Sequence, residues 1–215
     1  NQWHLNNTGQ YGAISGNDTN VFEAWDVTTG SPSVIIAIID DGVQLDHPDI
    51  SANIISGYDF LDDDNDPSPI DGSASDGAGV VGHGTSCAGV AAARGGNATG
   101  VVGACPMCRI LPIRAVGKNS MGGFITDKQV AQAFTYASDS GAAVINNSWG
   151  MYLGDPMVDG DEPERVPPPP VLKKAVQYVV ENGRNGIGTA IVFAAGNSNA
   201  DVELDGITSL PENIV

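Results

Sequence analysis

The sequence predicts an α/β fold of three layers, in which helices cover both faces of a mainly parallel, doubly wound sheet. The first observation behind this prediction is the alternation of short, β-branched apolar runs with longer stretches of helical periodicity. The second is that the apolar runs are continuous, which is typical of strands covered on both faces. The third is the length of 215 residues, which is enough for one sizeable domain with a buried core.

The apolar runs are predicted as strands. The clearest is 33–40, an almost unbroken run of Ile, Val and Ala that ends in an aspartate. The segment 109–116 is a weaker candidate, because Pro112 cannot donate a hydrogen bond to a neighbouring strand. The remaining predicted strands are 142–146, 189–195 and a core strand that begins at 214–215.

Helices are predicted between these strands. Residues 126–136 repeat apolar side chains at helical spacing and are followed by a stop signal at Gly141. Residues 171–183 place valine, leucine and alanine on one helical face. A helix of small residues is expected from His83, and a short one after Asn20, which is a typical N-cap residue.

Two polar segments interrupt this alternation. Residues 61–76 include the acidic run Asp62 to Asp66, and residues 151–170 are acidic and end in consecutive prolines. Strand and helix signals continue beyond both, so neither is interpreted as a domain linker. We expect residues 1–215 to form a single domain that is incomplete at its C-terminal end, because natural domain boundaries fall in exposed linkers and not inside core strands.

The chain is strongly acidic, with a formal net charge of -17 from 9 basic and 26 acidic residues. Such a charge excludes nucleic acid and anionic membranes as expected partners. It suits either a solvated surface in a salty or extracellular setting, or contact with cations or basic peptides. No apolar run reaches the roughly 18 residues that predict a membrane helix. No secretory signal begins the sequence, which is compatible with earlier removal of a targeting segment or pro-segment.

The cysteines are too few for a disulfide framework. Cys105 and Cys108 form a CxxC pair, which predicts a local disulfide if the chain is secreted. Zinc would need two more good ligands nearby, and Cys87 is the one remaining cysteine in the sequence. We therefore expect no zinc site at this pair.

Two titratable side chains lie where a parallel sheet carries its sites. Asp40 ends the apolar run 33–40, and a buried carboxylate there needs a partner such as a histidine N–H. His83 lies between two glycines at the start of the small-residue helix, where it stays accessible. Taken alone, each residue has a structural alternative: a turn-capping aspartate and a satisfied histidine.

Two further predicted strands end in polar motifs. Ser148-Trp149-Gly150 follows the strand 142–146, and its backbone could pair with an extended peptide. Asn197 follows Gly196 at the end of the strand 189–195, where its amide could point at a developing oxyanion. The structural alternatives are an ordinary strand-to-loop transition and a turn asparagine.

The order of these four motifs resembles the subtilisin (subtilase) family of serine peptidases. The family has the same succession of an aspartate on the first strand, a histidine that opens a helix, a peptide-pairing strand and a Gly-Asn pair. The resemblance covers nearly all of residues 1–215. Features more similar to the kexin and furin side of the family than to bacterial secreted enzymes are Gln2-Trp3-His4-Leu5, Asp40-Asp41, Cys87 and Ser148-Trp149-Gly150.

The resemblance implies roles for these residues. Asp40 would orient His83, which acts as general base and then as general acid, and Asn197 would donate to the oxyanion. One side of the substrate cleft would be lined by Ser148, Trp149 and Gly150. The opposing strand would be 119–124, with substrate contacts from Asn119, Met121, Gly122 and Gly123.

The resemblance also implies calcium. Asp49 and Asn97 match a tight calcium site of the family. The carbonyls of Arg94, Thr99 and Val101 would complete a set of oxygen ligands that suits this ion. The alternative is a glycine-rich loop that holds no ion.

Other acidic residues leave alternatives open. Asp155, Asp201 and Asp205 are candidates for a second ion. In kexin-like enzymes the second aspartate, here Asp41, helps to select a basic residue next to the cleavage site, and the acidic segment 155–164 could reinforce this preference. The alternative is that Asp41 caps a turn or contacts calcium while the acidic segment is merely solvated.

The serine of the family lies in a Gly-Thr-Ser-x-Ala segment that opens a later helix, and this sequence has no such segment. Gly84-Thr85-Ser86 is similar but belongs to the histidine helix, so Ser86 is not the predicted nucleophile. We therefore expect a serine endopeptidase whose serine lies outside these residues. The 215 residues alone should be inactive, because loss of the serine costs about 10⁶ in turnover in subtilisin, itself a member of the family.

Two other functions are alternatives to a serine endopeptidase. A pseudo-peptidase would keep the cleft and bind peptides without catalysis, but intact Asp40, His83 and Asn197 favour an enzyme. A different hydrolase would need a Gly-x-Ser-x-Gly elbow, which the sequence lacks. The expected partners are a protein or peptide substrate, together with a pro-segment or the remaining part of the domain, and the expected location is outside the cytoplasm.

Overall fold

The computed structural model describes residues 2–70, 82–150, 165–197 and 201–214. Its centre is a six-stranded sheet in the order β2-β3-β1-β4-β5-β6, and all of its strand pairs are parallel. The strands are β1 (Ile35–Asp40), β2 (Tyr58–Asp59), β3 (Arg109–Arg114), β4 (Val144–Asn147), β5 (Ala190–Phe193) and β6 (Asn213–Ile214). The strands predicted at 33–40, 109–116, 142–146 and 189–195 are confirmed. The core strand expected from 214 is instead the edge strand β6, in which Ile214 is 56 % exposed. β2 was missed because two residues show no periodicity.

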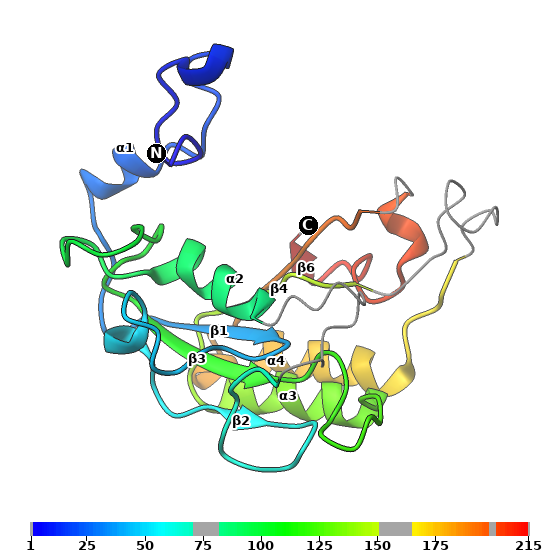
Figure 1. Ribbon diagram of the computed structural model, residues 1–215. Helices are drawn as coiled ribbons and strands as arrows, with labels where there is room; N and C mark the ends of the chain where they lie inside the picture. Colours follow the sequence, from blue (N-terminus) through cyan, green and yellow to red (C-terminus); the bar gives the residue numbers. More distant parts are fainter. Residues whose placement is uncertain (1, 71–81, 151–164, 198–200, 215) are drawn as a thin grey trace.

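The longer helices cover both faces of this sheet. Helices α3 and α4 lie on one face, and α2 lies on the other (Figure 1). The three-layer, doubly wound α/β fold predicted from the sequence is therefore confirmed. The helices are α1 (Val21–Trp25), α2 (His83–Ala92), α3 (Asp127–Asp139) and α4 (Pro170–Gly186), with short 3₁₀ helices at Gln10–Gly12, Ser51–Asn53 and Val202–Leu204.

Local signals explain the starts of α3 and α4. A capping box begins α3, in which the Thr126 side chain and the Gln129 side chain each bond the other residue's backbone N–H. Pro170 occupies the first turn of α4, where backbone N–H groups have no partner within the helix, so its missing N–H costs no hydrogen bond. The cap expected at Asn20 is wrong, because this residue has a φ of 52° and its side chain makes no capping hydrogen bond.

Pro112 lies inside β3, which weakened that prediction. The carbonyls of Ile110 and Arg114, two residues to either side, accept hydrogen bonds from Ile55 and Phe60 on the β2 side of the strand. Pro112 therefore directs its missing donor toward the same side, because backbone groups alternate along a strand. The paired part of β2 is only two residues long, so the missing donor removes little of the hydrogen bonding between β2 and β3.

Two cores form because the side chains of each strand alternate between the faces of the sheet. Ala37 and Ile39 of β1 belong to the larger core, which β1 shares with α3 and α4. Ile38 belongs to the smaller core beneath α2, with Ala88 and Ala92 of that helix. The same alternation directs the next even-numbered side chain of β1, that of Asp40, toward the α2 face.

The N-terminal residues 2–25 extend away from the sheet (Figure 1) and are attached to the loop before β3. The side-chain amide of Gln2 exchanges two hydrogen bonds with the backbone of Val102, at 2.7 and 2.9 Å. The Trp25 indole donates to the Ala104 carbonyl. Nearby, Cys105 and Cys108 are joined as a disulfide. No helix among the described residues is long and apolar enough to span a membrane.

Candidate active site

The predicted functional residues gather at the carboxyl ends of the central strands. β1 pairs with β3 on one side and with β4 on the other. The chain builds β2 and β3 on one side of β1 before it crosses to build β4, β5 and β6 on the other. Such a point of reversal is where open parallel sheets hold their ligands. Asp40, the last residue of β1, lies at this point.

Asp40 and His83 are brought together across the gap between β1 and α2. The distance from His83 Nδ1 to Asp40 Oδ1 is 2.8 Å. Gly84 makes this approach possible, because a Cβ at this position would lie 2.4 Å from the Gly42 carbonyl oxygen and 2.7 Å from the Asp40 Cβ. Any side chain there would push α2 away from the end of β1.

The two partners differ sharply in exposure. The Asp40 side chain is 2 % exposed, whereas that of His83 is 55 % exposed. Burial raises the pKa of Asp40 above its ordinary value, and the hydrogen bond with His83 opposes this shift. A buried carboxylate that accepts from Nδ1 fixes the orientation of the ring, so that Nε2 is available to take a proton from a nucleophile. The pair can therefore act as a general base.

Asp41 caps α2, which is one of the alternatives left open by the sequence. One carboxylate oxygen accepts from the backbone N–H groups of Gly82 and His83, at 3.3 and 3.1 Å. The other accepts from Gly84 N at 2.8 Å. A carboxylate at a helix N-terminus also interacts favourably with the helix dipole. Asp41 thereby holds the backbone that carries His83, and both of its oxygens are engaged in doing so.

Cys87 lies one turn after His83 on α2, with its Sγ 3.8 Å from His83 Nδ1. Burial is the main cause that raises the pKa of this thiol to about 11, and the nearby Asp40 carboxylate adds to the rise. The thiol is therefore neutral at physiological pH. A nucleophilic cysteine needs a depressed pKa, so this geometry does not favour a cysteine peptidase.

The motif 148–150 follows β4 beside this pair. The Trp149 indole donates to the Ile39 carbonyl at 2.8 Å, and its ring packs against Phe134 and Phe193. The main role of Trp149 is thus to anchor residues 148–150 to the core rather than to line a cleft. The Ser148 Oγ accepts from Asn146 Nδ2 at 2.9 Å.

The predicted opposing strand is a small hairpin, which we call the 118–124 hairpin. An isolated bridge joins Lys118 to Phe124. The Asn119 Oδ1 accepts from the backbone N–H groups of Met121 and Gly123, at 3.1 and 2.7 Å, so this side chain holds the turn from inside. Gly122 has a φ of 82°, a conformation that favours glycine. Met121 is 90 % exposed at the tip of the hairpin.

Asn197 follows β5, two strands away from β1 at the same edge of the sheet. Gly196 before it has a φ of 87°, which turns the chain sharply out of the strand. The Asn197 side chain is exposed. Its position at the carboxyl edge is compatible with donation to a reacting group above Asp40 and His83.

Two of the residues that the resemblance implies as calcium ligands contact the side chain of Asp49, a residue that is 2 % exposed. Its Oδ1 accepts from Asn97 Nδ2 at 2.8 Å, and its Oδ2 accepts from Val101 N at 2.7 Å. The loop wraps closely around this carboxylate, since a Cβ at Gly100 would lie 2.2 Å from Oδ2. Among the described residues no lysine, arginine or histidine pairs with Asp49. The carbonyls assigned as ligands from sequence belong to the same loop, at Arg94, Thr99 and Val101.

The other candidate acidic groups are only partly described. Asp155 and the acidic segment 155–164 lie outside the described residues. Asp201 caps a 3₁₀ helix by accepting from Glu203 N. Asp205 is buried, and its Oδ1 accepts from the backbone N–H groups of Ile207 and Thr208. Through these hydrogen bonds, both carboxylates stabilise the local backbone.

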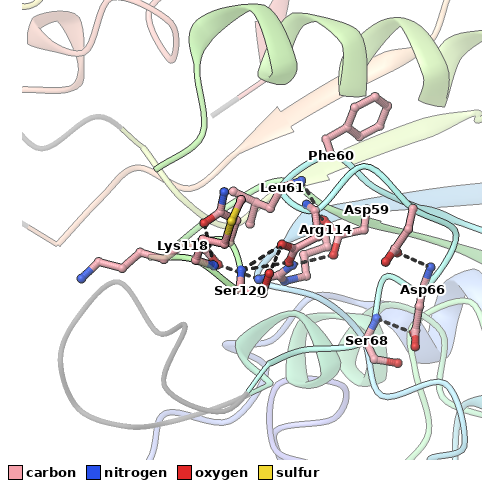
Figure 2. A network of polar contacts seen from close by, with 12 residues as sticks. Asp59, Phe60, Leu61, Asp66, Ser68, Arg114, Lys118 and Ser120 are labelled. Carbon is pink, nitrogen blue, oxygen red and sulfur yellow. Dashed lines mark hydrogen bonds and ion pairs between the residues drawn. The ribbon is translucent and has the colours of Figure 1, made fainter. Parts of the chain in front are cut away.

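Sequence reasoning missed an ion-pair network that joins the end of β3 to the acidic loop after β2 (Figure 2). Arg114 is fully buried and contacts Asp59 and Asp62, and Asp62 in turn contacts Ser120 of the hairpin. The signal available in the sequence was a lone arginine at the end of an apolar strand, since a buried guanidinium needs carboxylate partners.

Comparison with known proteins places this geometry in a family. The sequence profile of the subtilase family, Peptidase S8, matches residues 31–214. A thermophilic serine proteinase of Bacillus sp. (strain AK1) is 37% identical over 204 residues, which are 94% of this chain and 43% of that protein. A calcium-dependent protease of Trichormus variabilis is 38% identical over 212 residues, which are 97% of this chain and 30% of that protein.

Kexin-like proteins also match. A dibasic-processing endoprotease of Schizosaccharomyces pombe is 32% identical over 213 residues, which are 97% of this chain and 26% of that protein. The chain thus spans less than half the length of each of these relatives. Among solved structures, the complex of Aeromonas sobria serine protease with its chaperone aligns with a TM-score of 0.77 and 24% identity, covering 99% of this chain and 37% of that chain. A likeness at this identity shows the fold alone.

Proposed function

The chain belongs to the subtilase family of peptidases, and on this premise we propose that it is the front part of the catalytic domain of a serine endopeptidase. The observation that carries this proposal is the 2.8 Å contact between His83 Nδ1 and the buried Asp40 carboxylate, at the reversal point of the sheet. The resemblance of the motif order and the protease relatives support the same conclusion.

In the proposed mechanism, His83 accepts the proton of a serine hydroxyl as that oxygen attacks the peptide carbonyl, and then delivers the proton to the departing amine. Asp40 holds the ring and stabilises the imidazolium as it forms. Asn197 donates to the oxyanion from the end of β5. Asp41 positions His83 through the backbone of the first turn of α2.

The nucleophilic serine is proposed to lie outside these 215 residues. Ser86 is a poor candidate, because it lies on α2 among the residues that follow His83. The second candidate function, a peptide-binding pseudo-peptidase, would need no contact between the buried Asp40 carboxylate and the His83 ring. The contact that is present favours the enzyme.

Fluorophosphonate labelling tests this function. In the complete protein that contains this chain, we expect one label per molecule, located by peptide mass spectrometry on a serine outside residues 1–215. The 215-residue chain produced alone should carry no label and hydrolyse no peptide. Stoichiometric labelling of Ser86 or Ser148, or turnover by the chain alone, would contradict the assignment.

We further propose that Asp49, Asn97 and the carbonyls of Arg94, Thr99 and Val101 hold a calcium ion. The residue types fit, because carboxylate, amide and carbonyl oxygens suit calcium, and the loop that carries Asn97 and Val101 packs against a buried carboxylate that no cationic side chain among the described residues pairs with. The Asn97 amide now donates to Asp49, and half a turn of this amide would present its oxygen instead. Bound calcium would supply the positive charge for Asp49 and anchor the loop that follows α2.

Calcium removal is expected to lower the thermal stability of the protein. At a calcium concentration about 1,000 times the Kd, binding to the folded state alone contributes about 4 kcal/mol to the free energy of unfolding. Thermal unfolding with calcium and with a chelator measures this shift. Asp49→Asn should abolish it, whereas Asp46→Asn, which alters an exposed carboxylate that pairs with the Gln44 amide, should retain it. An equal calcium response in both variants would refute the site.

The proposed setting is extracytoplasmic, and the proposed partners are protein or peptide substrates and a pro-segment or the rest of the domain. The disulfide between Cys105 and Cys108 supports an oxidising compartment. The net charge of -17 favours basic over acidic peptides in long-range attraction. A preference for a basic residue at the cleavage site stays a proposal that rests on the kexin-like resemblance, because Asp41 is engaged in capping α2.

A further inference from the structure

Arg114 forms the centre of a polar network at the end of β3 (Figure 2). Its side chain is fully buried, so its positive charge requires partners within the protein. One terminal nitrogen donates to Asp59 Oδ2 at 2.5 Å and to Asp62 Oδ2 at 2.8 Å. The other donates to the Lys118 carbonyl at 2.6 Å, which fixes the first residue of the 118–124 hairpin.

Asp62 extends this network to the next turn of the hairpin. Its Oδ1 accepts from the Ser120 hydroxyl at 2.5 Å and from Ser120 N at 2.9 Å. The Ser120 hydroxyl and then Arg114 hold the pKa of the Asp62 carboxyl below its usual range, so the group is ionised at neutral pH. Hydrogen bonds to an ionised acceptor are stronger than neutral ones. Asp62 therefore links the buried Arg114 directly to the hairpin.

The hairpin is held together by its own hydrogen bonds, and its side chains are largely exposed. Asn119 closes its turn from inside, and Met121 and Phe124 are 90 % and 70 % exposed. The contacts of Arg114 with Lys118 and of Asp62 with Ser120 thus anchor the hairpin to the end of β3 and to the loop after β2. β3 ends beside Asp40, with Asp40 opposite Arg114 in the register, so these anchors also set the hairpin's position relative to the catalytic pair.

We propose that Asp62 is a positioning residue for the substrate, which it serves by fixing the 118–124 hairpin through Ser120 and Arg114. This inference rests on the proposed function, together with the substrate contacts that the family resemblance implies for residues 119–124. Asp62 does not touch the reacting atoms. Its loss should weaken the binding of long peptides and leave the chemistry at His83 unchanged.

The fold should tolerate this loss. If Asp62 is replaced by asparagine, Arg114 keeps its contact with Asp59, whose carboxylate is buried and also accepts from Leu61 N. The buried guanidinium therefore retains a charged partner. Asp63 provides a matched control one residue further along the same loop. It accepts from the Tyr58 hydroxyl, and its φ of 60° is tolerated by asparagine.

The test compares two substrates in the complete, active protein. One is a peptide with four residues before the scissile bond, and the other is a single amino-acid ester that does not reach the hairpin. For Asp62→Asn, we expect kcat/KM for the peptide to fall by about 10- to 100-fold, mainly through KM, while the ester changes by less than about threefold. Asp63→Asn should change neither value.

A second variant tests the link through Ser120. Ser120→Ala removes the hydroxyl but leaves the backbone N–H, so its loss on the peptide should be smaller than that of Asp62→Asn. The double variant should lose no more than Asp62→Asn alone, because both changes break the same contact. Equal losses on peptide and ester, or no loss on the peptide, would overturn the positioning role. A wild-type protein that cleaves neither substrate and takes no fluorophosphonate label would instead overturn the proposed function on which this role rests.

Discussion

Replacing His83 by alanine is expected to lower the kcat of the complete protein by about 10⁶-fold, the loss known for the histidine of subtilisin, a member of the same family. The physical reason is that His83 is the described group best placed to take the proton of the nucleophile, with its ring oriented by Asp40 at 2.8 Å. KM should change little, because the ring does not bind the ground state of the substrate. Steady-state kinetics on a peptide substrate measures both values.

Two controls distinguish lost catalysis from lost structure. The His83 side chain is 55 % exposed, so its removal opens no cavity, but the buried Asp40 carboxylate loses a partner, and the free energy of unfolding should fall by about 1–3 kcal/mol without loss of the fold. Cys87→Ala removes a neutral thiol 3.8 Å from His83 Nδ1 and should leave kcat close to that of the wild type. If Cys87→Ala is as damaging as His83→Ala, the thiol has a catalytic role that the present assignment lacks.

The fold could be predicted well from the sequence because each buried strand is recognisable from its apolar composition. Residues 33–40 are apolar at nearly every position, and β1 is buried on both faces as that run requires. The two-residue β2 has no such pattern, since its place beside β3 is decided by tertiary contacts. The short helix expected after Asn20 forms as α1, and none of its residues is buried, so few packing contacts extend it.

The candidate site was predictable where a motif fixes its own geometry. Asp40 at a strand end and His83 at a helix start can meet only if the helix packs on the sheet, and the absence of a Cβ at Gly84 allows that approach. The anchoring network was not predictable, because Asp62 and Ser120 are 58 positions apart in the sequence. An acidic run in a loop is usually solvated, and no local pattern marks the one carboxylate that turns inward.

Asp40→Asn is expected to lower kcat at neutral pH by about 10⁴-fold while leaving the protein at least as stable as before. An asparagine can offer its NH₂ to Nδ1, which favours the ring tautomer that cannot act as a base at Nε2. The stability argument follows from the pKa of Asp40, which burial raises above the ordinary value of 3.8. The folded state therefore binds the proton more tightly than the unfolded state does.

The sign of the pH dependence follows from this shift. Well below the ordinary pKa of 3.8 the carboxyl is protonated in both states and does not alter the free energy of unfolding. As the pH rises from that value through the raised pKa of the folded state, the unfolded state ionises freely, whereas the folded state must either keep the proton or bury a charge. Wild-type stability relative to Asp40→Asn should thus decline between acid and neutral pH, which thermal unfolding across that range measures. Asp41→Asn is the matched control: it removes one of two carboxylate oxygens that cap α2, so it should cost about 1 kcal/mol. An Asp40→Asn protein that is less stable than the wild type at pH 7 would mean that the contact with His83 outweighs the cost of burying the charge.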